Sequence, residues 1–238
     1  MDAAEDPPFL LVLTHGAGGG TGSADLRAAR QAGRDVGAAV ARVLQPYRVR
    51  GARAPGSPAR QDQAWLEIIG KLRRRFPGVP LVQGGRSNGA RVACRTARAA
   101  GARAVLALAF PLHPPGHPDR SRAAELAEAG TEVLVVNGAS DPFGIPEPGG
   151  GVQVVVLPGA AHALAGQGGA IRRVVGAWLA VLAQGSAAPS GGHPRAPGGV
   201  HSYRRRSSRD LHSMHRAANG SASSRATAIL RPQRSQTP

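Results

Sequence analysis

Cysteine, lysine and aromatic residues are scarce in this 238-residue chain, and long apolar runs are absent. The single cysteine, Cys94, excludes a disulfide framework and any metal site built from several cysteines. No stretch approaches the roughly 20 apolar residues that span a bilayer. Acidic residues stand near the N-terminus, where a secretory signal would carry basic ones. We therefore expect a cytoplasmic protein that is not associated with membranes.

The net charge of +16 is distributed unevenly along the chain. Residues 186–238 hold nine arginines against one acid, Asp210, and so carry half of it. Lys71 is the only lysine, and an excess of arginine over lysine fits a GC-rich coding sequence as well as nucleic-acid binding. The segment is rich in Ser, Pro, Gly and Arg, and it has too few apolar residues to offset the entropy of ordering. The sequence predicts a disordered tail over 186–238, able to bind polyanions weakly and without sequence preference.

Residues 1–185 alternate short apolar runs with amphipathic segments, a pattern typical of an α/β domain with a mostly parallel central sheet flanked by helices. The expected strands are 9–14, 79–83, 104–110, 132–137 and 153–157, with a short edge strand at 47–53. The expected helices are one capped by Ser23 and running to Leu44, and others over 65–76, 88–100, 123–129 and 171–182. We predict one domain over 1–185.

A G-x-S-x-G pattern lies between an expected strand and an expected helix: Gly85-Arg86-Ser87-Asn88-Gly89. A serine on a sharp strand-to-helix turn adopts a strained backbone, and glycines two residues to either side avoid a clash with the neighbouring chain. The turn lifts the hydroxyl above the sheet, and the following helix directs its first amides at a developing oxyanion. Such a pattern also arises by chance in a glycine-rich chain, but its position between strand and helix favours a nucleophile at Ser87.

A serine nucleophile requires a general base, and the base requires an orienting acid. Asp141 and His162 each follow an expected strand, in the chain order Ser, Asp, His, at the sheet edge where Ser87 lies. Taken singly, Asp141 is also explained as a turn residue before Pro142, and His162 as a surface histidine. Their joint occurrence with Ser87 favours a catalytic triad, with Glu147 as the alternative acid.

A glycine-rich turn follows the first expected strand: His15-Gly16-Ala17-Gly18-Gly19. Its exposed backbone amides, near Ala17, would pair with the amide of Asn88 to hold an oxyanion. It is neither a dinucleotide fingerprint nor a phosphate loop, because Thr21 stands where the third glycine belongs and no Gly-Lys-Ser/Thr follows. We expect His15 to pack at this turn, on the border of the pocket, rather than to act in catalysis.

With these residues the chain resembles the α/β-hydrolase superfamily, and within it a small dienelactone-hydrolase-like branch of predicted hydrolases. That branch is similar to a domain in a subunit of a nonspecific-lethal chromatin complex. The resemblance covers about residues 8–183. Its motifs are Thr14-His15-Gly16-Ala17-Gly18, Gly84-Gly85-Arg86-Ser87-Asn88-Gly89-Ala90-Arg91, Phe110-Pro111-Leu112-His113-Pro114-Pro115-Gly116, Asn137-Gly138-Ala139-Ser140-Asp141-Pro142 and Ala160-Ala161-His162.

The resemblance implies an α/β-hydrolase fold with a triad of Ser87, Asp141 and His162. It further implies that Leu112 and His113 line the pocket. Dienelactone hydrolases proper use a cysteine nucleophile, so a serine argues against that substrate.

The predicted function is hydrolysis of a small ester or thioester through an acyl-enzyme, without cofactor or metal. Only about 20 residues separate Phe110 from the strand that precedes Asp141, which leaves no room for a cap domain over the site. A small-molecule acyl substrate is therefore the expected partner. The alternative is a catalytically silent interaction module on the same fold.

Overall fold

The computed structural model describes residues 6–185. The tail 186–238, with its predicted disorder and polyanion binding, lies outside the described residues. Six strands form one sheet in the order β2-β1-β3-β4-β5-β6, and every neighbouring pair is parallel. The strands are β1 Leu10–Thr14, β2 Ala39–Val43, β3 Leu81–Arg86, β4 Ala104–Leu108, β5 Glu132–Gly138 and β6 Val152–Leu157. The predicted α/β class and parallel sheet are confirmed.

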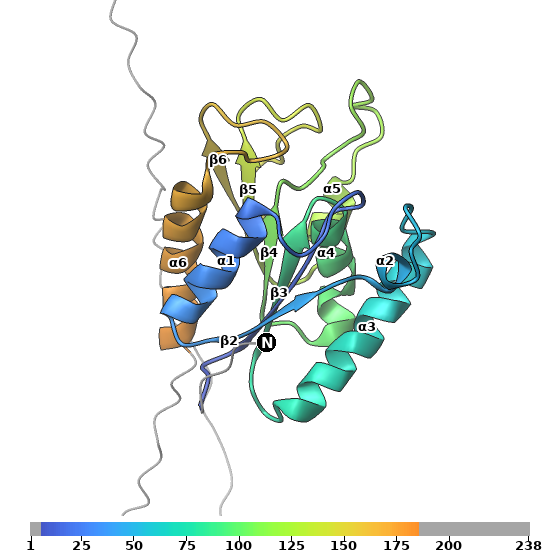
Figure 1. Cartoon of the computed structure of the whole chain (residues 1–238). Helices are drawn as coiled ribbons and strands as arrows, with labels where there is room; N and C mark the ends of the chain where they lie inside the picture. The colour runs from blue at the N-terminus through green and yellow to red at the C-terminus, as the bar shows by residue number, and fades with distance from the viewer. Residues whose placement is uncertain (1–5, 186–238) are drawn as a thin grey trace, which may run out of the picture. The chain divides into compact units, whose positions relative to one another are not determined.

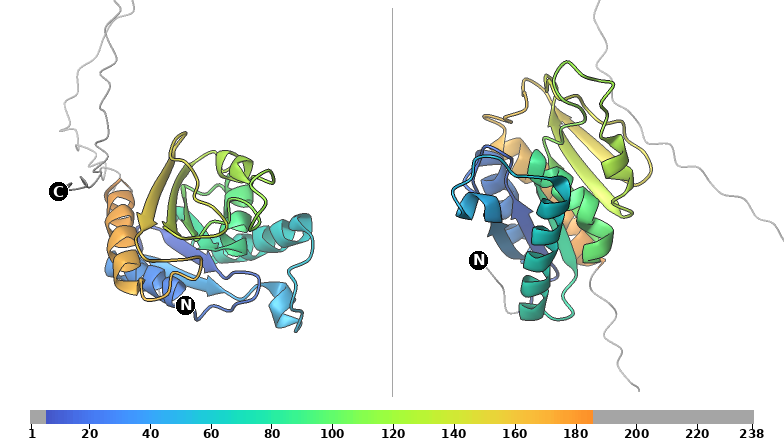
Figure 2. Two further views of the ribbon diagram at one scale, coloured as in Figure 1. Left: turned by 90° about the horizontal axis from the view of Figure 1, so that it is seen from above. Right: turned by 90° about the vertical axis from the view of Figure 1, so that its right-hand side faces the viewer.

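Helices cover both faces of the sheet (Figures 1 and 2). On one face α1 (Ala24–Asp35) packs against α6 (Gly168–Gln184), and on the other α3 (Pro58–Arg75) packs against α4 (Asn88–Ala100). The central strands β1 and β4 are buried along their whole length, with aliphatic side chains directed to both helical layers. Burial on both faces explains why these strands are continuous apolar runs in the sequence.

Two predicted elements were wrong, and both lie between β1 and α3. The helix expected from Ser23 to Leu44 ends at Asp35, where Gly37 adopts a positive φ of 77° and the chain turns into β2. Valines at 36, 40 and 43 satisfied a helical period, but β-branched side chains fit the strand that forms. Residues 47–53 form no edge strand, because Pro46 starts the short helix α2 (Pro46–Val49) and β2 takes the sheet edge.

The carboxyl ends of the strands meet at the upper end of the sheet in Figure 1. The loops that follow β1, β3, β5 and β6 all emerge there, because parallel strands share one direction. Between β4 and β5 the chain forms only α5 (Ala123–Ala127), so no cap domain is inserted at this point. Within residues 6–185, no helix combines the length and the apolar character needed to cross a membrane.

Candidate active site

Ser87 lies in a strained turn between β3 and α4, which we call the elbow (residues 85–89). Its backbone has φ 52° and ψ −116°, a region that side chains rarely adopt. A Cβ on Gly85 would come within 2.7 Å of the Thr14 carbonyl oxygen, and one on Gly89 within 2.7 Å of that of His15. Both glycines are therefore required for the turn to pack against the end of β1, as the motif predicts.

The three predicted polar residues meet at this turn. His162 Nε2 lies 3.0 Å from Ser87 Oγ, and His162 Nδ1 lies 2.9 and 3.1 Å from the two carboxylate oxygens of Asp141. The Asp141 side chain is fully buried, whereas the His162 side chain is 19% exposed. With Nδ1–H donating to Asp141, Nε2 is free to accept the serine proton. The alternative acid, Glu147, is exposed at the surface.

Two residues that sequence reasoning did not single out fix the acid and the base. The backbone amide of Phe143 donates to Asp141 Oδ1 at 2.9 Å, and its ring stacks on the His162 imidazole with centroids 4.2 Å apart. The Asn137 amide lies 3.4 Å from Asp141 Oδ2. Together these contacts orient the Asp141 carboxylate so that both of its oxygens face the His162 imidazole.

Asn137 also joins two neighbouring loops. Its Oδ1 accepts the Phe110 amide at 2.8 Å, and its Nδ2 donates to the carbonyls of Phe110 and Gly144 at 3.0 and 3.1 Å. The side chain is fully buried at the end of β5. A polar residue at the end of an otherwise apolar strand was the sequence signal for this role.

The glycine-rich loop after β1 lies against Ser87. Gly16 to Gly19 form a turn, closed by a 3.1 Å hydrogen bond from the Gly19 amide to the Gly16 carbonyl. A Cβ on Gly16 would lie only 3.2 Å from Ser87 Cβ. The Ala17 amide is not used by this turn hydrogen bond, and the Asn88 amide opens α4 with no preceding turn to accept it. The loop therefore contacts the turn at Ser87 through Gly16, and the oxyanion role of the Ala17 and Asn88 amides stays a prediction.

His15 packs within the turn, as expected, and its predicted place on the border of the pocket stays a prediction. It is 1% exposed, its Nδ1–H donates to the Gly16 carbonyl at 2.8 Å, and its Nε2 accepts the Gln45 amide at 3.0 Å. Burial lowers the pKa of His15, with a smaller contribution from the charge of Arg48, while the bond to Gly16 opposes the shift. Both ring nitrogens are occupied, so the imidazole is structural.

Leu112 and His113 are half-buried beside the loop that carries Asp141. The His113 amide donates to the Phe143 carbonyl at 2.9 Å, and its ring packs against Gly144. Their predicted role as pocket-lining residues stays a prediction.

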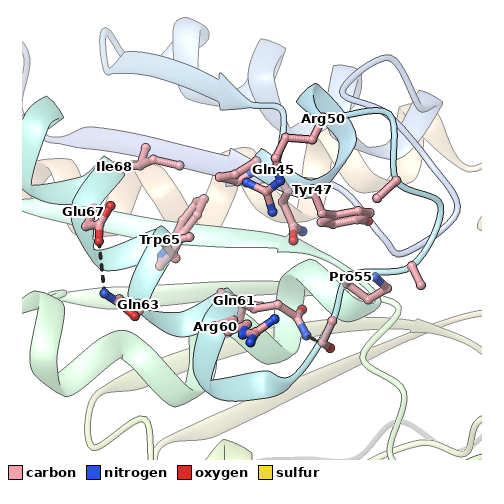
Figure 3. Close-up of a pocket in the computed structure, with 16 residues that line it drawn as sticks. Gln45, Tyr47, Arg50, Pro55, Arg60, Gln61, Gln63, Trp65, Glu67 and Ile68 are labelled. Atoms are coloured by element: carbon pink, nitrogen blue, oxygen red, sulfur yellow. Dashed lines mark hydrogen bonds between the residues drawn. The ribbon is translucent and has the colours of Figure 1, made fainter.

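A cavity of about 350 Å³ lies between α2, the following loop and α3, and none of Ser87, Asp141 and His162 lines it (Figure 3). Gln61 on its wall accepts a 2.7 Å hydrogen bond from the Asn88 side chain, and Tyr47 donates to the Ala17 carbonyl at 2.7 Å. Arg50 and Arg60 approach the cavity from opposite sides. Sequence reasoning missed this cavity because it assigned residues 47–53 to a strand.

Residues 6–185 contain neither an accessible thiol nor a cluster arranged to hold a metal ion. Cys94 is fully buried in α4, and burial strongly raises the pKa of its thiol. Among residues 6–185, no group of three His, Cys, Asp or Glu side chains is arranged to hold a metal ion.

Comparison with known proteins identifies the domain type. A family model described as "Alpha/beta hydrolase domain" matches residues 7–165. No curated protein matches the sequence. Similar solved structures include a serine hydrolase without a lid from Xanthomonas campestris, at 21% identity and a TM-score of 0.55, covering 74% of this chain and 86% of that one.

Two further structures share the fold. Est1E from Butyrivibrio proteoclasticus, solved with ferulic acid, has 13% identity and a TM-score of 0.60, covering 75% of this chain and 92% of that one. A dienelactone hydrolase from Anabaena variabilis has 17% identity and a TM-score of 0.58, covering 74% and 88%. At these identities the likeness concerns the fold.

Proposed function

The chain belongs to the alpha/beta hydrolase family, and from that premise we propose that it is a serine hydrolase of small esters or thioesters, with Ser87, His162 and Asp141 as its triad. One observation carries the proposal. Ser87 Oγ, on a strained turn, lies 3.0 Å from an imidazole nitrogen whose ring is held on its other side by a buried carboxylate at 2.9 Å. This is the arrangement that activates a serine hydroxyl.

In the reaction, Ser87 Oγ attacks the acyl carbon while its proton passes to His162 Nε2. Asp141 stabilises the imidazolium, and the amides of Ala17 and Asn88 donate to the oxyanion. Each such donor contributes on the order of 3 kcal/mol in the transition state. The carbon–oxygen or carbon–sulfur bond then breaks, and the leaving alcohol or thiol takes the proton from His162. Water, activated by the same imidazole, releases the acid from Ser87.

The substrate class follows from the space around the elbow. The chain inserts no cap between β4 and β5, and Ser87 is partly exposed. The cavity between α2 and α3 is reached from the turn through Gln61, which Asn88 contacts, and its volume is at the small end of the range for ligand pockets, roughly 300–1,000 Å³. A short acyl group extending from Ser87 toward this cavity fits there, and a long lipid chain does not.

The test is labelling by a fluorophosphonate probe, which reacts with activated serines. We expect labelling of the intact protein, none of Ser87→Ala, and at least about 100-fold slower labelling of His162→Ala. Ser140→Ala and His117→Ala are matched controls, because both side chains are exposed; Ser140 precedes Asp141, but its hydroxyl makes no hydrogen bond to the triad. They should label at the rate of the intact protein.

Absence of labelling in folded protein, or persistent labelling of Ser87→Ala, would contradict the proposal. The remaining function would then be that of a catalytically silent interaction module. If labelling succeeds, a panel of esters with acyl chains of two to twelve carbons should show kcat/KM falling once the acyl group exceeds the cavity.

A further inference from the structure

Arg86, the residue immediately before Ser87, contacts the start of α1 and the loop that carries His162. Its Nε forms an ion pair with Oδ2 of Asp25, in the first turn of α1, at 2.7 Å but without the alignment of a hydrogen bond. Its Nη2 donates to the main-chain carbonyl of His162 at 3.1 Å. One guanidinium therefore connects the nucleophile turn, the start of α1 and the loop that carries the base.

The position of Arg86 is fixed by a buried charge. Asp25 is 1% exposed, and its other oxygen, Oδ1, accepts the Leu26 amide at 2.8 Å. Within residues 6–185, Arg86 is its one ion-pair partner. An unpaired carboxylate at such a site is costly, so the guanidinium cannot turn away without leaving a buried charge uncompensated. Asp25 thus sets the orientation in which Arg86 meets the His162 carbonyl.

The loop that carries His162 is tied at several backbone positions. The Leu164 amide donates to the Ala161 carbonyl at 3.0 Å, and Leu164 itself is buried with a positive φ of 50°. The Ala160 carbonyl accepts the Ser140 amide at 2.9 Å, which joins this loop to the loop that carries Asp141. At His162 itself the main-chain carbonyl accepts from Arg86, across 76 residues of chain. This contact links the backbone of His162 directly to the turn that carries Ser87.

We propose that Arg86, oriented by Asp25, is a positioning residue that holds the His162 backbone so that Nε2 stays within reach of Ser87. The inference rests on the proposed hydrolase function. A planar guanidinium presents several donors in a rigid fork and meets both partners at once, which a lysine ammonium at the same place cannot do. Arg86 need not touch the substrate for this role.

The experiment compares Arg86→Gln, Arg86→Lys and Asp25→Asn with the intact protein, using kcat and KM for a short ester. Displacement of a base by about 1 Å costs about 100-fold in rate. We expect Arg86→Gln to lower kcat by about 100-fold with KM changed less than about twofold. The variant Arg86→Lys should keep part of the kcat that Arg86→Gln loses. Asp25→Asn should lower kcat by about 10-fold, since the fork loses its anchor.

Two further measurements keep the result interpretable. If Arg86→Gln fails to fold because Asp25 is left unpaired, the double variant Asp25→Asn/Arg86→Gln removes both charges and replaces it. Arg73→Gln is the matched control, because Arg73 also donates to a main-chain carbonyl, that of Ala100 at 2.6 Å, but at the far end of α4. It should leave kcat unchanged.

Hydrogen exchange over residues 158–167 distinguishes the two proposals. Faster exchange in Arg86→Gln than in Arg73→Gln supports the positioning role even if the intact protein hydrolyses no ester, which would refute only the proposed function. Unchanged exchange, a kcat within threefold of the intact protein, or a rise confined to KM would overturn the positioning role while leaving an active triad in place.

Discussion

Replacing Ser87 by glycine and by alanine measures the strain stored at the elbow. Both variants lose the hydroxyl and its 3.0 Å contact with His162, so they differ only in the Cβ. At φ 52° and ψ −116° that Cβ is crowded by its own backbone, whereas glycine adopts this conformation freely. We expect Ser87→Gly to be the more stable of the two.

The magnitude follows from two opposing contributions. A side chain held in such a backbone conformation costs about 1–3 kcal/mol. Glycine loses about 0.4–1 kcal/mol more chain entropy on folding than alanine does. The difference leaves Ser87→Gly more stable than Ser87→Ala by about 1 kcal/mol, or about 2–4 °C in Tm for a domain of this size.

Chemical and thermal denaturation of the two variants test this directly. Ser140 supplies the control pair: it lies in an exposed turn with negative φ, so Ser140→Ala should be more stable than Ser140→Gly. The sign of the alanine–glycine difference should therefore invert between the two sites. Equal stability of Ser87→Gly and Ser87→Ala, or alanine the more stable, would refute the reasoning that the elbow stores backbone strain.

Three further predictions concern the surroundings of the elbow. Gly89→Ala should destabilise the fold by about 1–3 kcal/mol in urea denaturation and slow probe labelling. The reason is that its Cβ would lie 2.8 and 2.7 Å from the Thr14 and His15 carbonyl oxygens. Unchanged stability would contradict this. Burial lowers the pKa of His15 below 6.5, so the unfolded chain takes up a proton at higher pH than the folded one. The free energy of unfolding should therefore fall as pH drops from 6.5 through the folded-state pKa. The variant His15→Gln should show a smaller decline. Because Arg50 and Arg60 flank the cavity, Arg50→Glu/Arg60→Glu should raise KM several-fold for an ester with a carboxylate on its acyl group, but not for its neutral analogue.

The strands that could be predicted most easily from the sequence are those whose side chains all face the protein interior. β1 and β4 are buried on both faces, so their aliphatic runs identified them. The segment from 36 to 53 could not be assigned in the same way. Its valines at 36, 40 and 43 follow a helical period although residues 39–43 form β2, and Gly37, at φ 77°, marks where the helix ends.

In the candidate site, too, some features follow from the local sequence and others only from tertiary contacts. Ser87 is recognisable because its glycines and its position between strand and helix are local requirements of the turn, which the 2.7 Å approaches at Gly85 and Gly89 explain. Asp141 and His162 are recognisable because parallel strands bring their following loops to one edge. No local pattern indicates that Arg86 meets the His162 carbonyl or that Phe143 stacks on its ring.

The fold class, the glycine-flanked turn at Ser87 and the order of the polar residues along the chain can be read from short-range backbone sterics and apolar periodicity. Tertiary packing alone sets how His162 is held, which residues line the cavity between α2 and α3, and that Asp25 is buried against Arg86. Those features depend on contacts between residues tens of positions apart, whose geometry is set by the packing of whole helices and loops against the sheet.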